Sequence, residues 1–107
     1  MQLEFYRDTA GDPRARGKGQ GEALAHFLEG DLQGSGKQGR AILHAIDRIE
    51  AGKLDRWEVT GNAYTLSLSP QGASLVNEID ENAKPFELPL AQLKETVADW
   101  TAFLDEG

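Results

Sequence analysis

The fold is decided by residues 54–80, LDRWEVTGNAYTLSLSPQGASLVNEID. Two runs rich in β-branched and aromatic residues, 57–60 and 64–69, flank the dipeptide Gly61-Asn62. Glycine and asparagine both tolerate positive φ and are favoured in tight two-residue connections between antiparallel strands. The pattern therefore predicts a β-hairpin.

A second turn, Pro70-Gln71-Gly72, leads into residues 73–80. There Leu75, Val76 and Ile79 supply the apolar side chains of a predicted third strand. Three strands make a small meander with one apolar face, and such a sheet is only marginally stable unless helices cover that face. We therefore expect helices from the flanking segments.

Those flanking segments carry the expected patterns. Residues 2–7 alternate apolar and polar side chains, which predicts a strand that joins the central sheet. Helical spacing of apolar residues recurs in 22–32, in 40–51 and, most regularly, in 90–104, where we expect a helix across the sheet that buries its tryptophan. Residues 86–88 form a short extended segment. The sequence therefore predicts an α+β fold in which an antiparallel β-meander of about four strands packs against two to three helices.

Composition sets the class of protein. The 107 residues are enough for one core, so we expect a single domain, 1–107. The absence of Cys excludes disulfides and thiolate chemistry and is compatible with a reducing compartment. No apolar run reaches the roughly 18 residues of a membrane span, and the N-terminus lacks the pattern of a secretory signal. We expect a cytoplasmic protein that does not contact membranes.

The charge is unevenly distributed along the chain. Residues 1–56 are neutral overall, whereas residues 57–107 hold two lysines against nine Asp and Glu residues, a net charge of −7. A surface of that sign repels phosphate backbones and attracts basic partners. Solubility alone is the simpler explanation, since net charge also serves that end.

Six acids are the candidate partner-binding residues. They are Glu78, Asp80, Glu81 and Glu87, beyond the third predicted strand, with Asp99 and Asp105 near the end of the last predicted helix. Any one of them is more often a solvated surface carboxylate that carries little energy. Acting together, they would suit a cleft lined by Lys and Arg.

These features favour an immunity protein, which binds and neutralises the basic toxin domain, such as a nuclease, of a bacterial competition system. The partner would be the cognate toxin domain, and the acidic residues would occlude its active-site cleft. We expect no enzymatic activity, no cofactor and no metal. The two histidines, His26 and His44, lie in predicted helices without the additional ligands that a metal site needs or the context of a catalytic triad.

Several residues together resemble a family of small uncharacterised bacterial proteins, the YacL type. The matching residues are Leu3-Glu4-Phe5-Tyr6-Arg7-Asp8, Glu22, His26-Phe27, Trp57-x-x-x-Gly61-x-x-Tyr64-Thr65-Leu66 and Val97-x-x-Trp100-x-x-Phe103. Gly21 departs from the pattern, which has a histidine there, and the segment 82–92 is shorter than usual. Because the matching residues are those that fold a hairpin and dock a helix, the resemblance implies a shared fold and supplies no activity.

The alternative is a housekeeping YacL-like cytoplasmic protein, acting as a nucleic-acid-binding module. Residues 8–21 are rich in glycine and form either a loop or a short edge strand, with Arg14, Arg16 and Lys18 at alternate positions. Together with Lys37, these side chains would contact phosphates. The commoner role of basic residues on an exposed strand is to discourage aggregation.

Overall fold

The structure, a computed structural model, describes residues 3–19, 21–33, 36–80 and 82–106. Its central feature is a four-stranded antiparallel sheet in which each strand pairs with the next along the chain. The strands are β3 (Trp57–Thr60), β4 (Tyr64–Ser69), β5 (Gly72–Asn77) and β6 (Phe86–Leu88). The predicted α+β fold with a four-stranded meander is confirmed.

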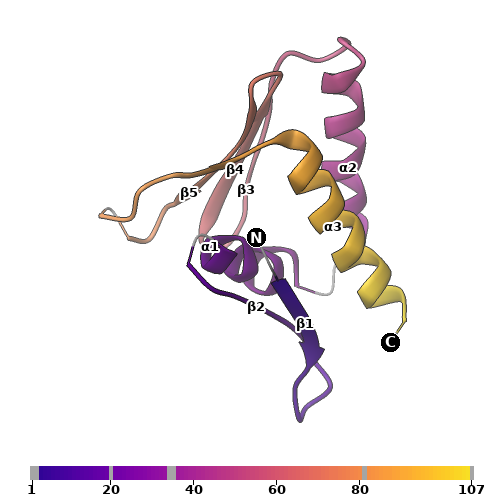
Figure 1. The fold of residues 1–107 in the computed structure, drawn as a ribbon, viewed down its shortest axis with the longest axis vertical. Coiled ribbons are helices and arrows are strands. Elements are labelled where there is room, and N and C mark those ends of the chain that lie inside the picture. The colour runs from indigo at the N-terminus through magenta and orange to yellow at the C-terminus, as the bar shows by residue number, and fades with distance from the viewer. Residues whose placement is uncertain (1–2, 20, 34–35, 81, 107) are drawn as a thin grey trace.

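The helices lie on one side of this sheet, where α2 and α3 pack side by side (Figure 1). They are α1 (Gly21–His26), α2 (Gly36–Glu50) and α3 (Leu90–Asp105). Helix α1 continues without a break into a π-helix, η1 (Phe27–Leu32). The helix predicted for residues 22–32 is therefore present, but its second half has the wider π geometry, which propensity does not encode.

Buried and partly exposed side chains alternate along β4, so the sheet has an inner face toward the helices and an outer face toward solvent. On β4 the side chains of Tyr64, Leu66 and Leu68 are buried beneath the helices, as are Leu75 of β5 and Leu88 of β6. The residues between them point the other way. The core is therefore closed by one face of the sheet, and the opposite face is left for other uses.

The hairpin connection differs from the prediction. It holds three residues, 61–63, and neither Gly61 nor Asn62 has a positive φ. Glycine is needed here for a different reason, because a Cβ at Gly61 would lie 2.6 Å from Oδ2 of Asp31. Close approach of η1 to the hairpin explains this glycine.

The first strand does not join the central sheet, contrary to expectation. Instead β1 (Leu3–Arg7) pairs with β2 (Pro13–Gly17) in a separate two-stranded sheet. The side chain of Phe5 packs edge-on against Trp100 of α3, with 5.2 Å between ring centroids, and against Phe103 at 5.7 Å. These aromatic contacts hold the small sheet against the helix layer, away from the edges of the central sheet.

Helix α3 packs chiefly along α2 and also touches β5. Trp100 is fully buried, as predicted, and its Nε1 donates a hydrogen bond to the carbonyl oxygen of Gln33 at 3.1 Å. The two helices approach closely at Gly39, where a Cβ would lie 2.5 Å from Cγ2 of Thr101. Helices α2 and α3 are thus packed more closely than the spacing of their apolar residues alone predicts.

The third strand ends earlier than predicted. Strand β5 stops at Asn77, whose Oδ1 accepts hydrogen bonds from the backbone nitrogens of Ile79 and Asp80 at 2.9 and 3.0 Å. An asparagine that caps a turn in this way ends a strand. Ile79 is therefore 73% exposed instead of lying in the sheet interior.

Candidate functional site

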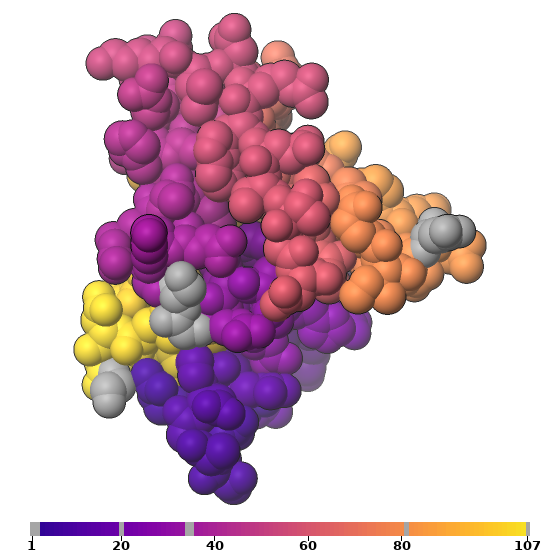
Figure 2. Space-filling model, turned by 180° about the vertical axis from the view of Figure 1, so that it is seen from behind, coloured from indigo at the N-terminus to yellow at the C-terminus, as the bar shows by residue number. Residues whose placement is uncertain are grey.

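The outer face of the four-stranded sheet is the most distinctive open surface of the described chain. It consists of Glu58 and Thr60 on β3, Thr65, Ser67 and Ser69 on β4, Ser74 and Val76 on β5, and Glu87 on β6. Every one of these side chains is at least partly exposed to solvent. In the view from behind, residues of these strands lie at the surface, coloured pink to orange (Figure 2).

One row crosses all four strands of this face. Strand pairing places Glu58 opposite Ser67, Ser67 opposite Ser74, and Ser74 opposite Glu87. The hydroxyl of Ser67 donates a hydrogen bond to Oε2 of Glu58 at 3.0 Å, which orients that carboxylate along the row. With neighbouring strands about 4.8 Å apart, the two carboxylates stand at the ends of a row about 14 Å long. The sheet therefore displays two negative charges on a rigid polar base.

A shallow hollow of about 590 Å³ continues this face toward the turn between β4 and β5. Its walls include Arg56, Ser69, Gln71, Ser74 and Glu87. Hydroxyl, amide and charged groups from three segments thus meet around one depression. Such a surface suits polar or charged side chains of a partner better than an apolar ligand.

The loop between β5 and β6, residues 78–85, projects beyond the sheet (Figure 1). It carries Glu78 and Asp80, both exposed, on either side of Ile79. Glu81, also predicted to bind a partner, lies outside the described residues. A hollow of about 370 Å³ lies beside Ile79, and Asn62 also lines it.

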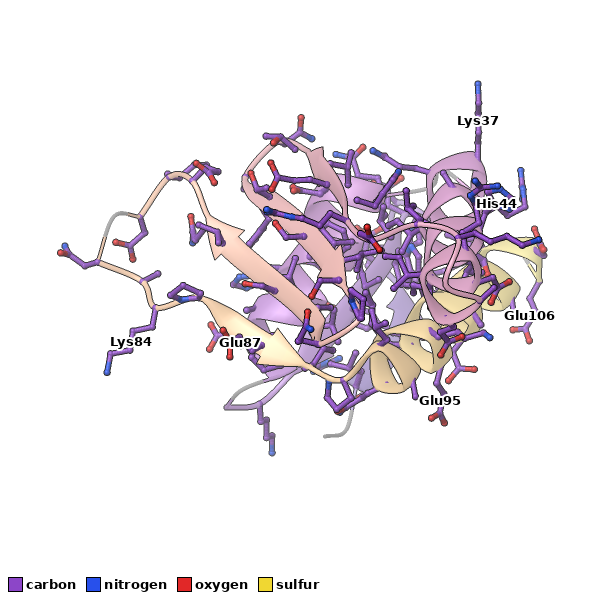
Figure 3. The ribbon with its side chains drawn as sticks, turned by 90° about the horizontal axis from the view of Figure 1, so that it is seen from above. Lys37, His44, Lys84, Glu87, Glu95 and Glu106 are labelled. Atoms are coloured by element: carbon purple, nitrogen blue, oxygen red, sulfur yellow. The ribbon has the colours of Figure 1, made fainter. Side chains whose placement is uncertain are left out.

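The structure does not bring all six predicted acids together. Glu78, Asp80 and Glu87 belong to the outer face and the loop beyond it, whereas Asp99 and Asp105 lie on α3. Figure 3 shows the separation, with Glu87 at the edge of the sheet and Glu106 at the far end of α3. Asp99 and Asp105 are both exposed on α3, the helix that packs along α2 and touches β5.

Two basic side chains lie on this side of the molecule, Arg56 at the hollow and Lys84 on the projecting loop (Figure 3). Of the two lysines after residue 57, Lys94 is held by α2, with its Nζ 2.9 Å from Asp47 and 3.4 Å from Glu50. Hydrogen bonds and charge attraction from these two carboxylates raise the pKa of Lys94 above its ordinary value of 10.5. The other, Lys84, lies on the projecting loop (Figure 3).

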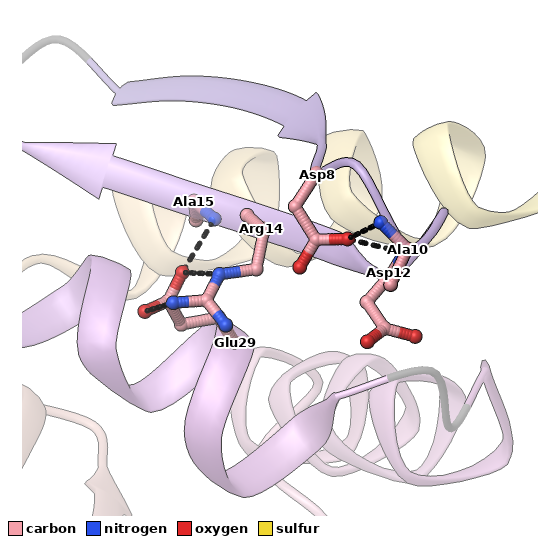
Figure 4. A network of polar contacts seen from close by, with 6 residues as sticks. All are labelled: Asp8, Ala10, Asp12, Arg14, Ala15 and Glu29. Atoms are coloured by element: carbon pink, nitrogen blue, oxygen red, sulfur yellow. Dashed lines mark hydrogen bonds and ion pairs between the residues drawn. The ribbon is translucent and has the colours of Figure 1, made fainter.

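The basic residues of β2 are already engaged within the chain. Arg14 forms an ion pair with Glu29 of η1, with 3.3 Å between Nε and Oε2, and the same carboxylate accepts the backbone N–H of Ala15 at 2.9 Å (Figure 4). Arg16 lies 3.7 Å from Glu4 and stacks over the ring of Tyr6. Two of the four side chains proposed to contact phosphates therefore form ion pairs within the chain, although the pair of Arg16 is exposed to solvent.

The acidic and phenolic groups near η1 are used in folding. Asp31, only 9% exposed, accepts hydrogen bonds from the backbone nitrogens of Ala63 and Tyr64. Burial, followed by the nearby carboxylates of Asp31 and Glu22, raises the pKa of Tyr64 above its ordinary value of 10.0. Burial and these carboxylates thus both favour the neutral form of the phenol.

Within residues 3–19, 21–33, 36–80 and 82–106, no group of three or more His, Cys, Asp or Glu side chains is placed to hold a metal ion. In the same part of the chain, no helix has the length and apolar character needed to cross a bilayer.

Three residues of the row across the outer face, Glu58, Ser67 and Ser74, are not among the residues predicted from the sequence. The prediction rests on acids after the third predicted strand, and none of the three is such an acid. The signal was present in the alternation of residues 57–60 and 64–69, which places Glu58 and Ser67 opposite the buried set. Their exact alignment with Glu87, however, depends on the register of a fourth strand.

Comparisons with known proteins agree with the resemblance found in the sequence. A family model described as "Uncharacterised protein family (UPF0231)" matches residues 1–98. A UPF0231 protein of Shewanella amazonensis is 26% identical over 99% of this chain and 98% of its own length. A UPF0231 protein of Proteus mirabilis is 31% identical over 66% of this chain and 57% of its own length. No solved structure matches the chain significantly.

Proposed function

From the premise that the chain belongs to the uncharacterised protein family UPF0231, we propose that it is a non-catalytic cytoplasmic protein that binds a positively charged protein through the outer face of its sheet. In its most specific form, the proposal is an immunity protein. It neutralises a basic toxin domain, such as a nuclease, of a bacterial competition system by occluding the active-site cleft.

One observation carries the proposal. The strand positions of the outer face hold the carboxylates of Glu58 and Glu87 and no basic side chain, on a base of serine and threonine hydroxyls. The loop beyond adds Glu78 and Asp80. The carboxylate of Glu58, which the Ser67 hydroxyl holds, loses less conformational freedom on binding than an unrestrained side chain, so more of its interaction energy is available for affinity.

The chemistry of a nuclease cleft matches this surface. Such clefts hold phosphates with Lys and Arg side chains, and a partner with ordered carboxylates competes for the same cations. Opposite charge also accelerates encounter at low salt. The exposed Ile79 would supply an apolar anchor next to the charged contacts.

The internal pairing of Arg14 and Arg16 supports a protein partner over a nucleic acid. A phosphate backbone approaching β2 would have to displace Glu29 and Glu4 from these guanidinium groups. On the outer face it would meet the like charges of Glu58 and Glu87, which repel it. The geometry therefore favours the binding of a basic protein.

The test is a pairwise binding measurement. The probe is the catalytically inactivated toxin domain encoded beside this gene, titrated at two salt concentrations. The variant E58K/E87K reverses both ends of the row, and D105K/E106K is the matched control, with the same change in net charge at the end of α3.

We expect salt-sensitive binding that E58K/E87K weakens by at least about tenfold, because repulsion replaces attraction at two points. The control should stay close to wild type, and co-expression of the wild type with the active toxin should permit growth. If both variants lose the same amount of affinity for the toxin domain, the outer face is not the binding surface. No binding by the wild type, or no adjoining toxin domain, would overturn the immunity function.

A further inference from the structure

A second open surface lies between the small sheet and the helix layer. It is a groove of about 1040 Å³ bounded by β1, the end of β2 and α3. Leu3 and Phe5 line it from β1, and Glu95, Thr96 and Asp99 line it from α3. This volume is at the upper end of ligand sites in proteins, and the groove is separate from the outer face.

One wall of the groove is a free strand edge. Strand β1 pairs with β2 on one side only, so the backbone groups on its other side have no strand partner. Within the described residues, no hydrogen bond reaches β1 backbone groups from the α3 side. Such an edge is a template for pairing with another extended chain.

The opposite wall is negatively charged. Glu95 and Asp99 stand one helical turn apart on α3 and are both exposed. In the described part of the chain, neither carboxylate has an ion-pair or hydrogen-bond partner. Glu95 points outward from α3 in Figure 3. Their charge is therefore available to a ligand.

Two basic residues, Arg16 and Lys18, also line the groove, against the three acids Glu4, Glu95 and Asp99, so the lining has a net charge of 2 − 3 = −1. Arg16 is paired with Glu4 and stacked on Tyr6. Lys18 follows β2 beyond the pairing of Leu3 with Gly17, so it lies at one end of the groove. The stretch of α3 that faces the free edge therefore presents acidic groups.

We propose that this groove binds an extended peptide with Lys or Arg at two alternate positions, which adds to β1 as a third strand. Residues two apart in a strand are about 6.6 Å apart, and residues four apart on a helix are about 6 Å apart along the axis. Two alternate basic side chains therefore match the spacing of Glu95 and Asp99. Backbone pairing with β1 supplies the remaining contacts.

The peptide itself is the first experimental variable. An eight-residue peptide with two alternate lysines among threonine and valine is titrated into the isotopically labelled full chain and followed by amide chemical shifts. The matched peptides carry glutamate in place of both lysines, or methyl groups on the backbone nitrogens that would face β1. We expect shifts in β1 and in residues 92–99 with the lysine peptide alone.

The protein variant E95Q/D99N isolates the charged wall, and D105N/E106Q is its control on the same helix outside the groove. Since exposed charge pairs contribute modestly, we expect E95Q/D99N to weaken peptide binding roughly tenfold and the control to leave it unchanged. Equal binding of the methylated and unmethylated peptides would overturn strand addition. Chemical-shift changes confined to the outer face would show that the peptide does not bind in the groove. If the chain forms a dimer that excludes the peptide, the groove binds a second copy of the chain and the proposal is wrong.

Discussion

The carboxylate of Asp31 lies 2.9 Å from the backbone nitrogen of Tyr64 and joins the π-helix to the start of β4. It also accepts the N–H of Ala63 at 3.1 Å. The side chain of Asn62 donates to the carbonyl oxygen of Gly30 at 3.1 Å, so the hairpin turn and the helix are joined at several points. This junction fixes the hairpin that carries half of the outer face.

Removing that carboxylate should destabilise the fold. In D31A two buried or partly buried N–H groups lose their acceptor, and we expect a loss of about 2–3 kcal/mol in the free energy of unfolding. Urea denaturation followed by tryptophan fluorescence measures it. D31N keeps one acceptor oxygen and should fall between D31A and wild type, while D99A serves as an exposed control. A D31A protein as stable as D99A would refute the role given to this junction.

Two glycines near the junction should respond differently to alanine. A Cβ at Gly61 would lie within 3 Å of Asp31, whereas one at Gly30 would have no heavy atom within 4 Å apart from its chain neighbours and the backbone of its own helix. We expect G61A to lose about 1–3 kcal/mol of stability, as overpacked sites do, and G30A to change little. Thermal unfolding of both variants provides the measurement. Similar melting temperatures would mean that η1 does not approach the hairpin this closely.

Stability should decline at alkaline pH. Tyr64 and Lys94 both have raised pKa values in the folded state, so the folded protein binds more protons than the unfolded chain there. Their contribution is complete below the ordinary values of 10.0 and 10.5 and is lost as the pH rises through the raised values. Y64F should make the loss of stability with rising pH less steep. In an ultraviolet absorbance titration, the same variant should lack the phenol with the raised pKa. Y6F should retain both features, and an unchanged decline in Y64F would contradict the assignment.

The helix layer offers a third packing test. G39A improves helix propensity but places a methyl group against Cγ2 of Thr101, whose hydroxyl is fixed by a 2.9 Å hydrogen bond to the carbonyl oxygen of Ala98. We expect G39A to be destabilising by about 1 kcal/mol in the wild type and neutral or stabilising in T101S, which lacks that methyl group. A double-mutant cycle by urea denaturation measures the difference. If the effects of G39A and T101S on the free energy of unfolding are additive, the contact between these two residues is excluded.

The hairpin and the last helix could be predicted because their signals are local. Alternation in 57–60 and 64–69 fixes which side chains are buried, and apolar spacing along α3 fixes its buried stripe. The partner of β1 is a different problem. Its alternation predicts a strand, but Phe5 meets Trp100, which is distant in sequence, and only the tertiary structure shows that contact.

The sequence predicts the acidic character of the candidate site better than it predicts which residues lie together there. Excess acid after residue 57 favours a partner of positive charge, and Glu78, Asp80 and Glu87 lie in β6 and the loop before it. Asp99 and Asp105 were grouped with them because sequence carries charge but not the direction in which α3 runs. The row from Glu58 to Glu87 needed the pairing register of four strands.

The central claim is that a basic protein docks on the outer face, and amide chemical-shift mapping of the labelled chain with the inactivated toxin domain tests it most directly. We predict that shifts cluster on residues 58, 67, 74 and 87 and in the loop 78–85, and that they fade as salt is raised. Shifts confined to the outward side of α2, or to the groove beside β1, would contradict the account.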